Sequence, residues 1–227
     1  RSMHPIEGLD ESMSKPGSEI EQYLRSHPEP SHLDVLIIDL CGNAVGKRLP
    51  ASAMASVFDH GTPVCAAMQL VDVMGNTEDP MGYGFSDGDP DAFAVPVPGT
   101  LCPVPWLSGN KSQVLCEFVS ASDGQPLWYE PRQVLKKVLN RFNDLGLSPR
   151  LAVELEFYLL ESQRDRNEKP IAAASPRTGL TETNGKVLSL DKLDEVDEVL
   201  GNIESACRQQ NIPTTSMISE YGAGQFE

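Results

Sequence analysis

The stretch Val153-Glu154-Leu155-Glu156-Phe157-Tyr158 places two carboxylates two residues apart in an otherwise apolar run. On an extended strand, residues i and i+2 share one face with Cα atoms roughly 6.5–7 Å apart, so Glu154 and Glu156 would repel each other there. A solvated face on an edge strand relieves that repulsion. A shared divalent cation also relieves it, because hard cations such as Mg²⁺ prefer carboxylate oxygen. The pattern alone leaves both interpretations open.

A second acidic motif, Glu220-Tyr-Gly-Ala-Gly-Gln-Phe-Glu227, ends the sequence. Gly222 and Gly224 permit a positive φ and a close backbone approach, so the segment can fold back and bring Glu220 and Glu227 together. A surface turn with incidental acids fits the same residues. Together with the first motif it supplies four glutamates and neither Cys nor His, which favours an oxygen-only Mg²⁺ or Mn²⁺ site over a zinc site.

The composition of the 227-residue chain is that of a globular protein, with 40% hydrophobic and 22% charged residues. The 18 Lys+Arg against 33 Asp+Glu give a net charge of −15, which argues against nucleic-acid and anionic-membrane partners. No apolar run approaches the ~18–20 residues that span a bilayer. The start lacks the apolar core of a signal peptide. Five cysteines without a Cys-x-x-Cys pair indicate a reducing compartment, so a cytoplasmic location is expected.

The first part of the chain reads as a polar N-terminal segment, 1–32, followed by a small sheet-rich domain, 33–125. Ile20, Tyr23 and Leu24 stand at helical spacing and predict a short helix in the polar segment. The β-branched run before Cys41 predicts a strand and a turn. Further predicted elements are a helix around 51–59 and short apolar runs, read as strands, at 68–73, 92–97 and 113–119.

Residues 126–227 read as the start of a second domain. Pro131 opens a predicted helix with an apolar stripe at period 3.6, and Gly146 follows its end. After it we expect a strand (151–160), a loop (161–185), one helix (191–210) and another strand (213–219). Because the sequence stops on a glycine-rich turn and a carboxylate, the expectation is that this second domain is incomplete.

An acidic loop, Asp87-Gly-Asp-Pro-Asp91, begins like a calcium-binding loop. Ala92 stands where that loop requires Gly, and Pro98 where it requires Glu, so an EF-hand is rejected. A plain turn, or a loop that contacts a cation or an amine, remains.

Glu-Leu-Glu156-Phe-Tyr and the 220–227 loop, in this order and about seventy residues apart, resemble the metal-binding strand and the Glu-x-x-x-Gly-Gln-x-Glu loop of the glutamine synthetase family. The segment Asp39 to Arg48 is similar to the first hairpin of that family's β-grasp domain, with Val45-Gly46-Lys47 in place of Arg-Gly-Lys. The stretch from Asp87 to Trp106 resembles the branch that joins glutamate to polyamines or other amines. The resemblance covers roughly residues 33–227.

The resemblance implies roles for individual residues. Glu156, Glu220 and Glu227 match the carboxylates that hold the metal nearer the amino-acid substrate, and Glu154 matches a ligand of the second metal, which bridges the nucleotide phosphates. Asp91 matches the aspartate that helps to bind and deprotonate the attacking ammonium. The second catalytic aspartate has no firm match, and Asp87 is only a candidate. The second metal's His, the glutamate-binding arginines and most nucleotide contacts of the family would lie beyond residue 227.

The sequence therefore predicts an α+β fold: a β-grasp-like N-terminal domain and the first part of a glutamine-synthetase-type catalytic domain. The implied function is that of a fragment of an ATP-dependent ligase, which joins the γ-carboxyl of glutamate to a polyamine or ammonia through γ-glutamyl phosphate. Mg²⁺ or Mn²⁺ is the implied cofactor, ATP the co-substrate, and a homo-oligomeric ring the implied assembly of the whole protein. The fragment alone is expected to be inactive. The alternative is a non-catalytic assembly or binding module, and a third possibility, a carboxylate-pair hydrolase, needs no glycine loop with further acids.

Overall fold

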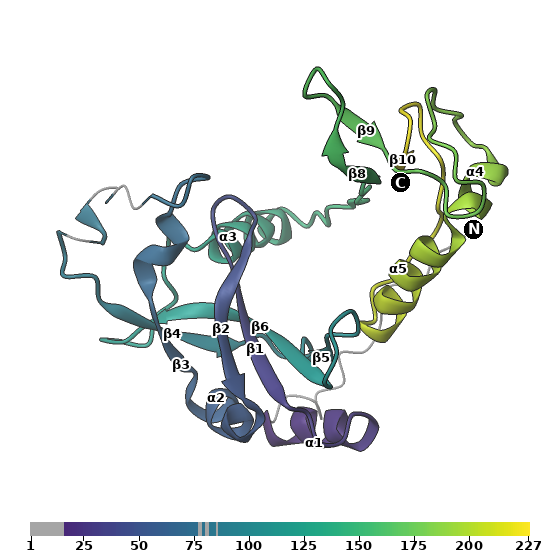
Figure 1. The fold of residues 1–227 in the computed structure, drawn as a ribbon. Helices are drawn as coiled ribbons and strands as arrows, with labels where there is room; N and C mark the ends of the chain where they lie inside the picture. The colour runs from purple at the N-terminus through teal and green to yellow at the C-terminus, as the bar shows by residue number, and fades with distance from the viewer. Residues whose placement is uncertain (1–15, 77–78, 80–81, 85) are drawn as a thin grey trace. The chain divides into compact units, whose positions relative to one another are not determined.

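The computed structural model describes residues 16–76, 79, 82–84 and 86–227, so the start of the polar N-terminal segment lies outside the described residues. The chain divides into two compact units, Arg1–Pro149 and Arg150–Glu227. Both contain helices and strands, so the α+β mixture expected from the sequence is confirmed (Figure 1).

A mixed six-stranded sheet forms the framework of the first unit. Its strands are β1 (His32–Ile38), β2 (Ala44–Pro50), β3 (Thr62–Cys65), β4 (Asp91–Pro96), β5 (Cys102–Pro103) and β6 (Lys111–Ser120). The order is β2-β1-β6-β4-β3, and β5 pairs with β6. Only the β1–β6 pair among these is parallel. The first half of β6 therefore pairs with β1 and its second half with β4, which places β6 at the centre of the unit.

In its described residues, the first unit has three α-helices besides the sheet. They are α1 (Pro16–Ser26), α2 (Met54–His60) and α3 (Pro131–Asp144), with 3-10 helices at Ala51–Ala53 and Ala66–Leu70. Alternate residues of β1 point into the core, and α2 adds three buried side chains. The main core residues are Leu33, Val35, Ile37, Met54, Val57, Phe58, Val64, Ala92, Ala94, Val114, Cys116 and Phe118.

Polar contacts tie α1 to the sheet. The hydroxyl groups of Tyr23 and Ser112 are 2.8 Å apart and both residues are buried. The carboxylate of buried Glu19 accepts the backbone N–H groups of Gly99 and Leu101, each at 3.0 Å. The short helix predicted from the spacing of apolar residues is thus part of the first unit's packing.

Two segments of the first unit differ from the sequence prediction. The apolar run 68–73 is not a strand, because its first half lies in the 3-10 helix Ala66–Leu70. A short apolar run fits a buried helical turn as well as a strand, so periodicity could not decide between them. Helix α3 begins at Pro131 and ends before Gly146 as predicted, but it packs in the first unit, whereas the predicted domain boundary at 125/126 assigned it to the second.

Buried Glu117 on β6 explains where α3 packs. Its carboxylate accepts hydrogen bonds from Arg132 Nε and Gln133 Nε2, each at 2.9 Å, and forms an ion pair with Lys136. Burial alone would raise the pKa of this carboxyl, but the hydrogen bonds from Lys136 and Arg132 outweigh burial and hold it below the usual range. One acidic side chain therefore gathers three side chains of the first turns of α3.

The second unit consists of two short antiparallel strand pairs and two helices. Its elements are β7 (Phe157–Tyr158), β8 (Leu160–Arg164), β9 (Pro170–Ala172), α4 (Leu190–Glu195), α5 (Asp197–Gln209) and β10 (Gln225–Phe226). Strand β7 pairs with β10, and β8 pairs with β9, both antiparallel. The predicted loop 161–185 therefore contains most of a β-hairpin, which its polar sequence did not predict.

Three more predictions for the second unit were wrong in detail. The predicted strand 151–160 forms only from Phe157 onward, since the residues before it pair with no strand in the described part of the chain. Residues 213–219 form no strand either, and only Ser219 makes an isolated bridge, to Phe226. The predicted helix 191–210 is broken at Val196, whose φ of −122° and ψ of 20° are not helical.

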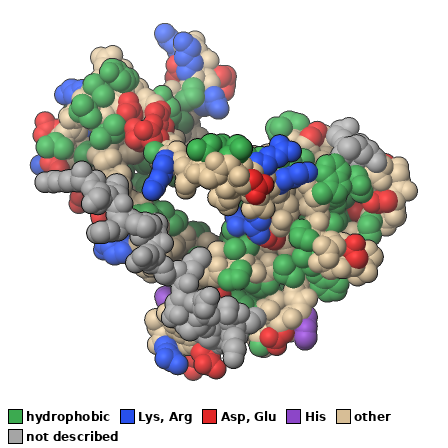
Figure 2. Space-filling view, turned by 180° about the vertical axis from the view of Figure 1, so that it is seen from behind, with side chains coloured by type: hydrophobic (Ala, Val, Ile, Leu, Met, Phe, Trp, Pro, Cys, Tyr) green, Lys and Arg blue, Asp and Glu red, His purple; other side chains and the backbone are tan. Residues whose placement is uncertain are grey.

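Hydrophobic side chains also reach the surface, where Figure 2 shows them as patches among charged groups. Those on α3 are Val134, Leu135, Val138 and Phe142, and those before β7 are Leu151, Val153 and Leu155. Across the described residues, no helix combines the length and the apolar composition that crossing a membrane requires.

Candidate metal centre

The β7–β10 pair positions the first two acidic side chains of the site. Its register places Gln225 opposite Tyr158 and Phe226 opposite Phe157, with the two phenyl centroids 6.1 Å apart. One step further along the same register, Glu227 stands opposite Glu156. Cross-strand neighbours have Cβ atoms about 4.5–5.5 Å apart, so an antiparallel pair of this register brings two carboxylates together.

The glycine-rich loop before β10 positions the third acidic side chain of the site, that of Glu220. Gly224 has a φ of +71°, and a Cβ there would lie 2.8 Å from the carbonyl oxygen of Leu159, so only glycine fits without strain. The carbonyl of Gly224 accepts the N–H of Leu159 at 2.8 Å, and the N–H of Glu220 donates to the carbonyl of Gln225 at 2.9 Å. The loop is thereby closed onto β7, and Glu220 faces the strand ends.

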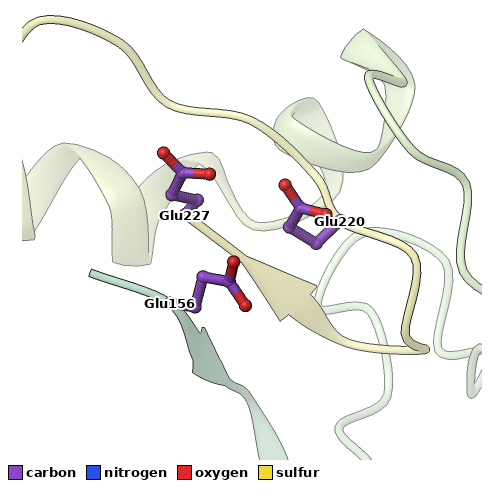
Figure 3. A group of neighbouring side chains, drawn as sticks. All are labelled: Glu156, Glu220 and Glu227. Atoms are coloured by element: carbon purple, nitrogen blue, oxygen red, sulfur yellow. The ribbon is translucent and has the colours of Figure 1, made fainter. Parts of the chain in front are cut away.

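The three carboxylates meet at one place. One carboxylate oxygen each from Glu156, Glu220 and Glu227 lies within 4.8 Å of the other two. Figure 3 shows the three side chains around a common space, Glu156 from the strand facing the two from the loop and β10. Glu220 and Glu227 are half-buried and Glu156 is exposed, so the group is open to solvent on one side.

The fourth predicted ligand, Glu154, is not in this group. It lies in the exposed extended segment before β7. Its charge nevertheless acts on Glu227, whose pKa is raised by partial burial and then by repulsion from Glu154, Glu220 and Glu156. The structure thus brings three of the four predicted carboxylates together and leaves the fourth at the edge.

Gln225 orients two parts of the site. Its Nε2 donates to a carboxylate oxygen of Glu156 at 2.8 Å, and its Oε1 accepts the N–H of Gly222 at 2.8 Å. Gln225 belongs to the loop motif, but its place in the sequence predicts no role for it. Glu182 was missed altogether, because it lies in a polar stretch predicted to be a loop, and its carboxylate accepts the N–H of Gly224 at 2.8 Å.

The donor set fits a hard divalent cation. Three carboxylates that repel one another would be stabilised by a cation between them, and carboxylate oxygens are the ligands that Mg²⁺ and Mn²⁺ prefer. Partial burial, and after it repulsion from the other carboxylates, raises the pKa of Glu227. Neither His nor Cys belongs to the group, so its chemistry disfavours zinc.

The acidic loop lies in the first unit, next to aromatic side chains. Asp91 is exposed at the start of β4, opposite Cys65 on β3. Asp87 accepts the N–H groups of Gly84 and Asp89, at 2.9 and 3.1 Å, as an ordinary turn residue does.

Tyr83 and Trp128 both pack against Tyr129, with ring centroids 5.1 and 5.6 Å from it. Burial raises the pKa of Tyr129, and the charge of Asp87 raises it further, which places this acid close to the aromatic cluster. Trp128 remains 62% exposed. The loop therefore combines carboxylates with accessible aromatic faces, a combination that suits a cationic group.

A cluster of three carboxylates on a β-strand pair and a glycine loop is an arrangement that oxygen-liganded metal sites use. Comparison with known families is more specific. Residues 128–227 match the family described as "Glutamine synthetase, catalytic domain". This match confirms, over residues 128–227, the resemblance inferred from the sequence.

Individual relatives are γ-glutamyl-amine ligases by name. The chain is 36% identical to the γ-glutamylputrescine synthetase PuuA of Escherichia coli (strain K12) over 92% of its own length and 44% of that protein. It is 30% identical to the glutamate–isopropylamine ligase of a Pseudomonas species over 90% of its own length and 44% of that protein. The chain thus spans less than half of the length of these curated relatives.

Solved structures agree at the level of the fold. The structure titled "GmaS/ADP complex-Conformation 1" matches with a TM-score of 0.67 at 22% identity, over 90% of this chain and 42% of that one. A "novel glutamine synthase homolog" matches with a TM-score of 0.63 at 19% identity, over 87% and 42%. These likenesses place the fold among glutamine-synthetase-like proteins.

Proposed function

We propose that this chain supplies the β-grasp-like domain and the first part of the catalytic domain of an ATP-dependent glutamate–amine ligase. The observation that carries the proposal is the group formed by Glu156, Glu220 and Glu227, on a fold shared with glutamine-synthetase-like proteins. The family match begins at residue 128, so the catalytic sequence is proposed to start near residue 126, with helix α3 as its part that packs in the first compact unit. Residues 33–125 would then be the β-grasp-like domain.

Glu156, Glu220 and Glu227 hold one divalent metal in this proposal, and Glu154 contributes to a second metal near the nucleotide phosphates. Mg²⁺ or Mn²⁺ would neutralise phosphate charge as the γ-phosphoryl group moves from ATP to the γ-carboxylate of glutamate. The chain's own residues fix the carboxylates: the β7–β10 register sets Glu156 against Glu227, and Gln225 holds the Glu156 carboxylate in place. Amine attack on the acyl phosphate then releases inorganic phosphate and forms the amide.

The acidic loop is proposed to receive the amine. Asp91 would bind the ammonium form and take its proton, with Asp87 as a second candidate. Support comes from the neighbouring aromatic cluster of Tyr83, Trp128 and Tyr129, since aromatic faces attract organic cations. The named activities of the relatives, on putrescine and isopropylamine, point the same way.

The proposed setting is polyamine or nitrogen metabolism in the cytoplasm, with glutamate, ATP and an amine as substrates. A homo-oligomeric ring is proposed for the complete protein, with Asp91 facing the metals of a neighbouring subunit. The alternative function is a non-catalytic binding or assembly module, which would keep the fold and the metal site without turnover.

Phosphate release distinguishes these functions. The protein expressed from its complete coding sequence is assayed with ATP, glutamate, Mn²⁺ and a panel of ammonia, putrescine, isopropylamine and ethanolamine. The ligase predicts phosphate release that requires both glutamate and an amine, and that is lost in Glu220→Gln. Metal binding without such release would favour the non-catalytic module, and release without glutamate would contradict the ligase.

A further inference from the structure

We infer that Glu182 is a positioning residue for the metal-binding carboxylates, acting through the backbone of the glycine loop. This inference rests on the proposed metal site. Glu182 lies 42 residues before Gly224, and its Oε2 accepts the Gly224 N–H at 2.8 Å. Gly224 stands between Glu220 and Glu227, the two carboxylates that the loop contributes.

The contact is built into the second unit. The Glu182 side chain is only 13% exposed, and its Oε1 is buried without a hydrogen-bond partner. This oxygen lies 3.4 Å from the ammonium of Lys192, which is itself 13% exposed. A carboxylate accepting a backbone N–H forms a charge-assisted hydrogen bond, which is stronger than a neutral one. The loop is therefore fastened by a partly buried charge.

Lys192 stabilises the negative charge of the partly buried Glu182 carboxylate. Its ammonium also pairs with Glu195 at 3.0 Å. Partial burial by itself would lower the pKa of Lys192, but its contacts with Glu195 and Glu182 outweigh burial and raise it, so the lysine stays charged. Glu182 is thus engaged by Gly224 and Lys192, which explains why it acts on the loop without joining the group of three carboxylates.

The chain around Glu182 supports the loop along its length. The N–H of Leu188 donates to the carbonyl of Ser219 at 2.8 Å, and the N–H of Ser189 donates to the Ser219 hydroxyl at 2.8 Å. The backbone at Gly185 lies so close to the loop that a Cβ there would stand 1.9 Å from the Tyr221 carbonyl oxygen. Residues 182–189 therefore form a cradle for residues 219–224, and Glu182 is its contact at the turn itself.

This arrangement predicts that Glu182 sets metal affinity without touching the metal. Removing its carboxylate frees the Gly224 N–H and lets Glu220 and Glu227 separate under their own repulsion. Groups that orient metal ligands typically change affinity about 10- to 100-fold when they are replaced. The conservative change Glu182→Asp keeps the charge for Lys192 but draws the acceptor away from Gly224.

The test measures two quantities on the 227-residue chain. Mn²⁺ dissociation constants are determined by titration, and amide exchange of Gly224 is followed in the metal-free chain by selective labelling of its 18 glycines. Glu182→Ala should weaken Mn²⁺ binding about 10- to 100-fold and speed Gly224 exchange about 10-fold or more. Glu182→Asp should fall between Ala and the wild type, and it decides the question if the Ala variant does not fold.

Glu161→Ala is the matched control, because Glu161 also accepts a backbone N–H in this unit, at 2.8 Å, but from Ala174 and not from a residue of the glycine loop. It should leave both quantities within about twofold. Wild-type Mn²⁺ affinity or wild-type Gly224 exchange in the folded Glu182 variants would overturn the inference. If the wild-type chain itself binds no Mn²⁺, the proposed metal site fails, while a change in Gly224 exchange still tests the contact.

Discussion

Three carboxylates lie within 4.8 Å of one another in the second unit, and they repel one another when no cation is present. Partial burial and then repulsion from Glu154, Glu220 and Glu156 raise the pKa of Glu227. At the scale of single residues, the site is held together by contacts that do not carry its charge, such as the amide of Gln225 on Glu156.

Replacing one ligand tests the centre most directly. Glu220→Gln keeps the size of the side chain and removes one of three charges, so Mn²⁺ affinity should fall by more than ~10-fold, because ligand charge sets the affinity of oxygen sites. Isothermal titration of the 227-residue chain measures this. Glu204→Gln on α5, an exposed acid in an i,i+4 pair with Arg208, serves as the control and should bind Mn²⁺ as the wild type does. Equal affinities in the two variants would show that the cluster is not the binding site.

Glu130 predicts a pH dependence of stability in the first unit. It is 1% exposed, and burial followed by repulsion from Glu117 raises its pKa to about 7, against the partial compensation of Gln133, Arg132 and Lys136. A raised carboxyl pKa means that the folded state binds the proton more tightly. Its stabilising effect is therefore complete below the unfolded pKa, near 4.5, and is lost as pH rises to about 7.

The expected loss is about 2 to 3 kcal/mol of unfolding free energy across that pH window. Both tryptophans, Trp106 and Trp128, lie in the first unit, so fluorescence-detected urea unfolding from pH 4.5 to 8 follows this unit. Glu130→Gln should flatten the profile and be the more stable form at pH 8. The exposed Glu21→Gln on α1 should retain the wild-type slope. A wild-type slope in Glu130→Gln would assign the pH dependence to other groups.

At the scale of elements, the attachment of α3 to β6 depends on Glu117. Glu117→Ala removes the acceptor for Arg132, Gln133 and Lys136 together. Because Arg132 and Lys136 are 31% and 50% exposed, they can regain water, so the expected loss of stability is about 1–3 kcal/mol rather than the full penalty of a buried unpaired charge.

Urea unfolding at pH 8 measures the effect of Glu117→Ala. Glu117→Gln should lose less, because its amide oxygen can still accept one of these hydrogen bonds. Equal stability of the Ala variant and the wild type would mean that α3 is held by its apolar contacts alone.

Elements with a strong local signal were predictable from the sequence. Helix α3 was predicted from its stripe of apolar residues and from Pro131 at its start. Strands β1 and β6 were predicted from their apolar runs. The β8–β9 hairpin was not found, because its residues are polar and their pairing depends on partners that the sequence does not reveal. The break at Val196 was missed for a similar reason, since the apolar stripe continues through it.

The convergence of three of the four predicted carboxylates followed from the sequence, but the residues that support them did not. The Glu pairs stand in short motifs whose spacing follows strand geometry and glycine turns. Glu182 has no such pattern, because its contact with Gly224 spans 42 residues and arises only when the cradle folds. The register that sets Glu227 opposite Glu156 is likewise a property of the folded pair.

At the scale of the whole molecule, the net charge of −15 and the acidic loop favour a cationic amine over ammonia as the nucleophile. Asp91→Asn in the protein from the complete coding sequence should raise KM for putrescine about 10-fold or more and leave KM for glutamate within about twofold. Steady-state phosphate release measures both constants. Asp59→Asn, an exposed acid on α2, is the control. Ammonia as the best substrate, with putrescine inert, would contradict this prediction.

The 227-residue chain alone should bind Mn²⁺ but should not catalyse the ligation. Phosphoryl transfer requires cationic groups around the γ-phosphate, and losing such stabilisation typically costs ~10³-fold in rate. Lys192, whose partner Glu182 contacts the glycine loop, is already engaged by Glu182 and Glu195. The assay contains ATP, glutamate, putrescine and saturating Mn²⁺. Phosphate release by the chain should be at least ~10³-fold slower than by the E. coli γ-glutamylputrescine synthetase. That enzyme, of which the chain matches 44%, also serves as the positive control of the assay. Turnover within tenfold of that enzyme would show that the residues present here suffice for catalysis, and the assignment of the phosphate-binding roles to other parts of the family's fold would be wrong.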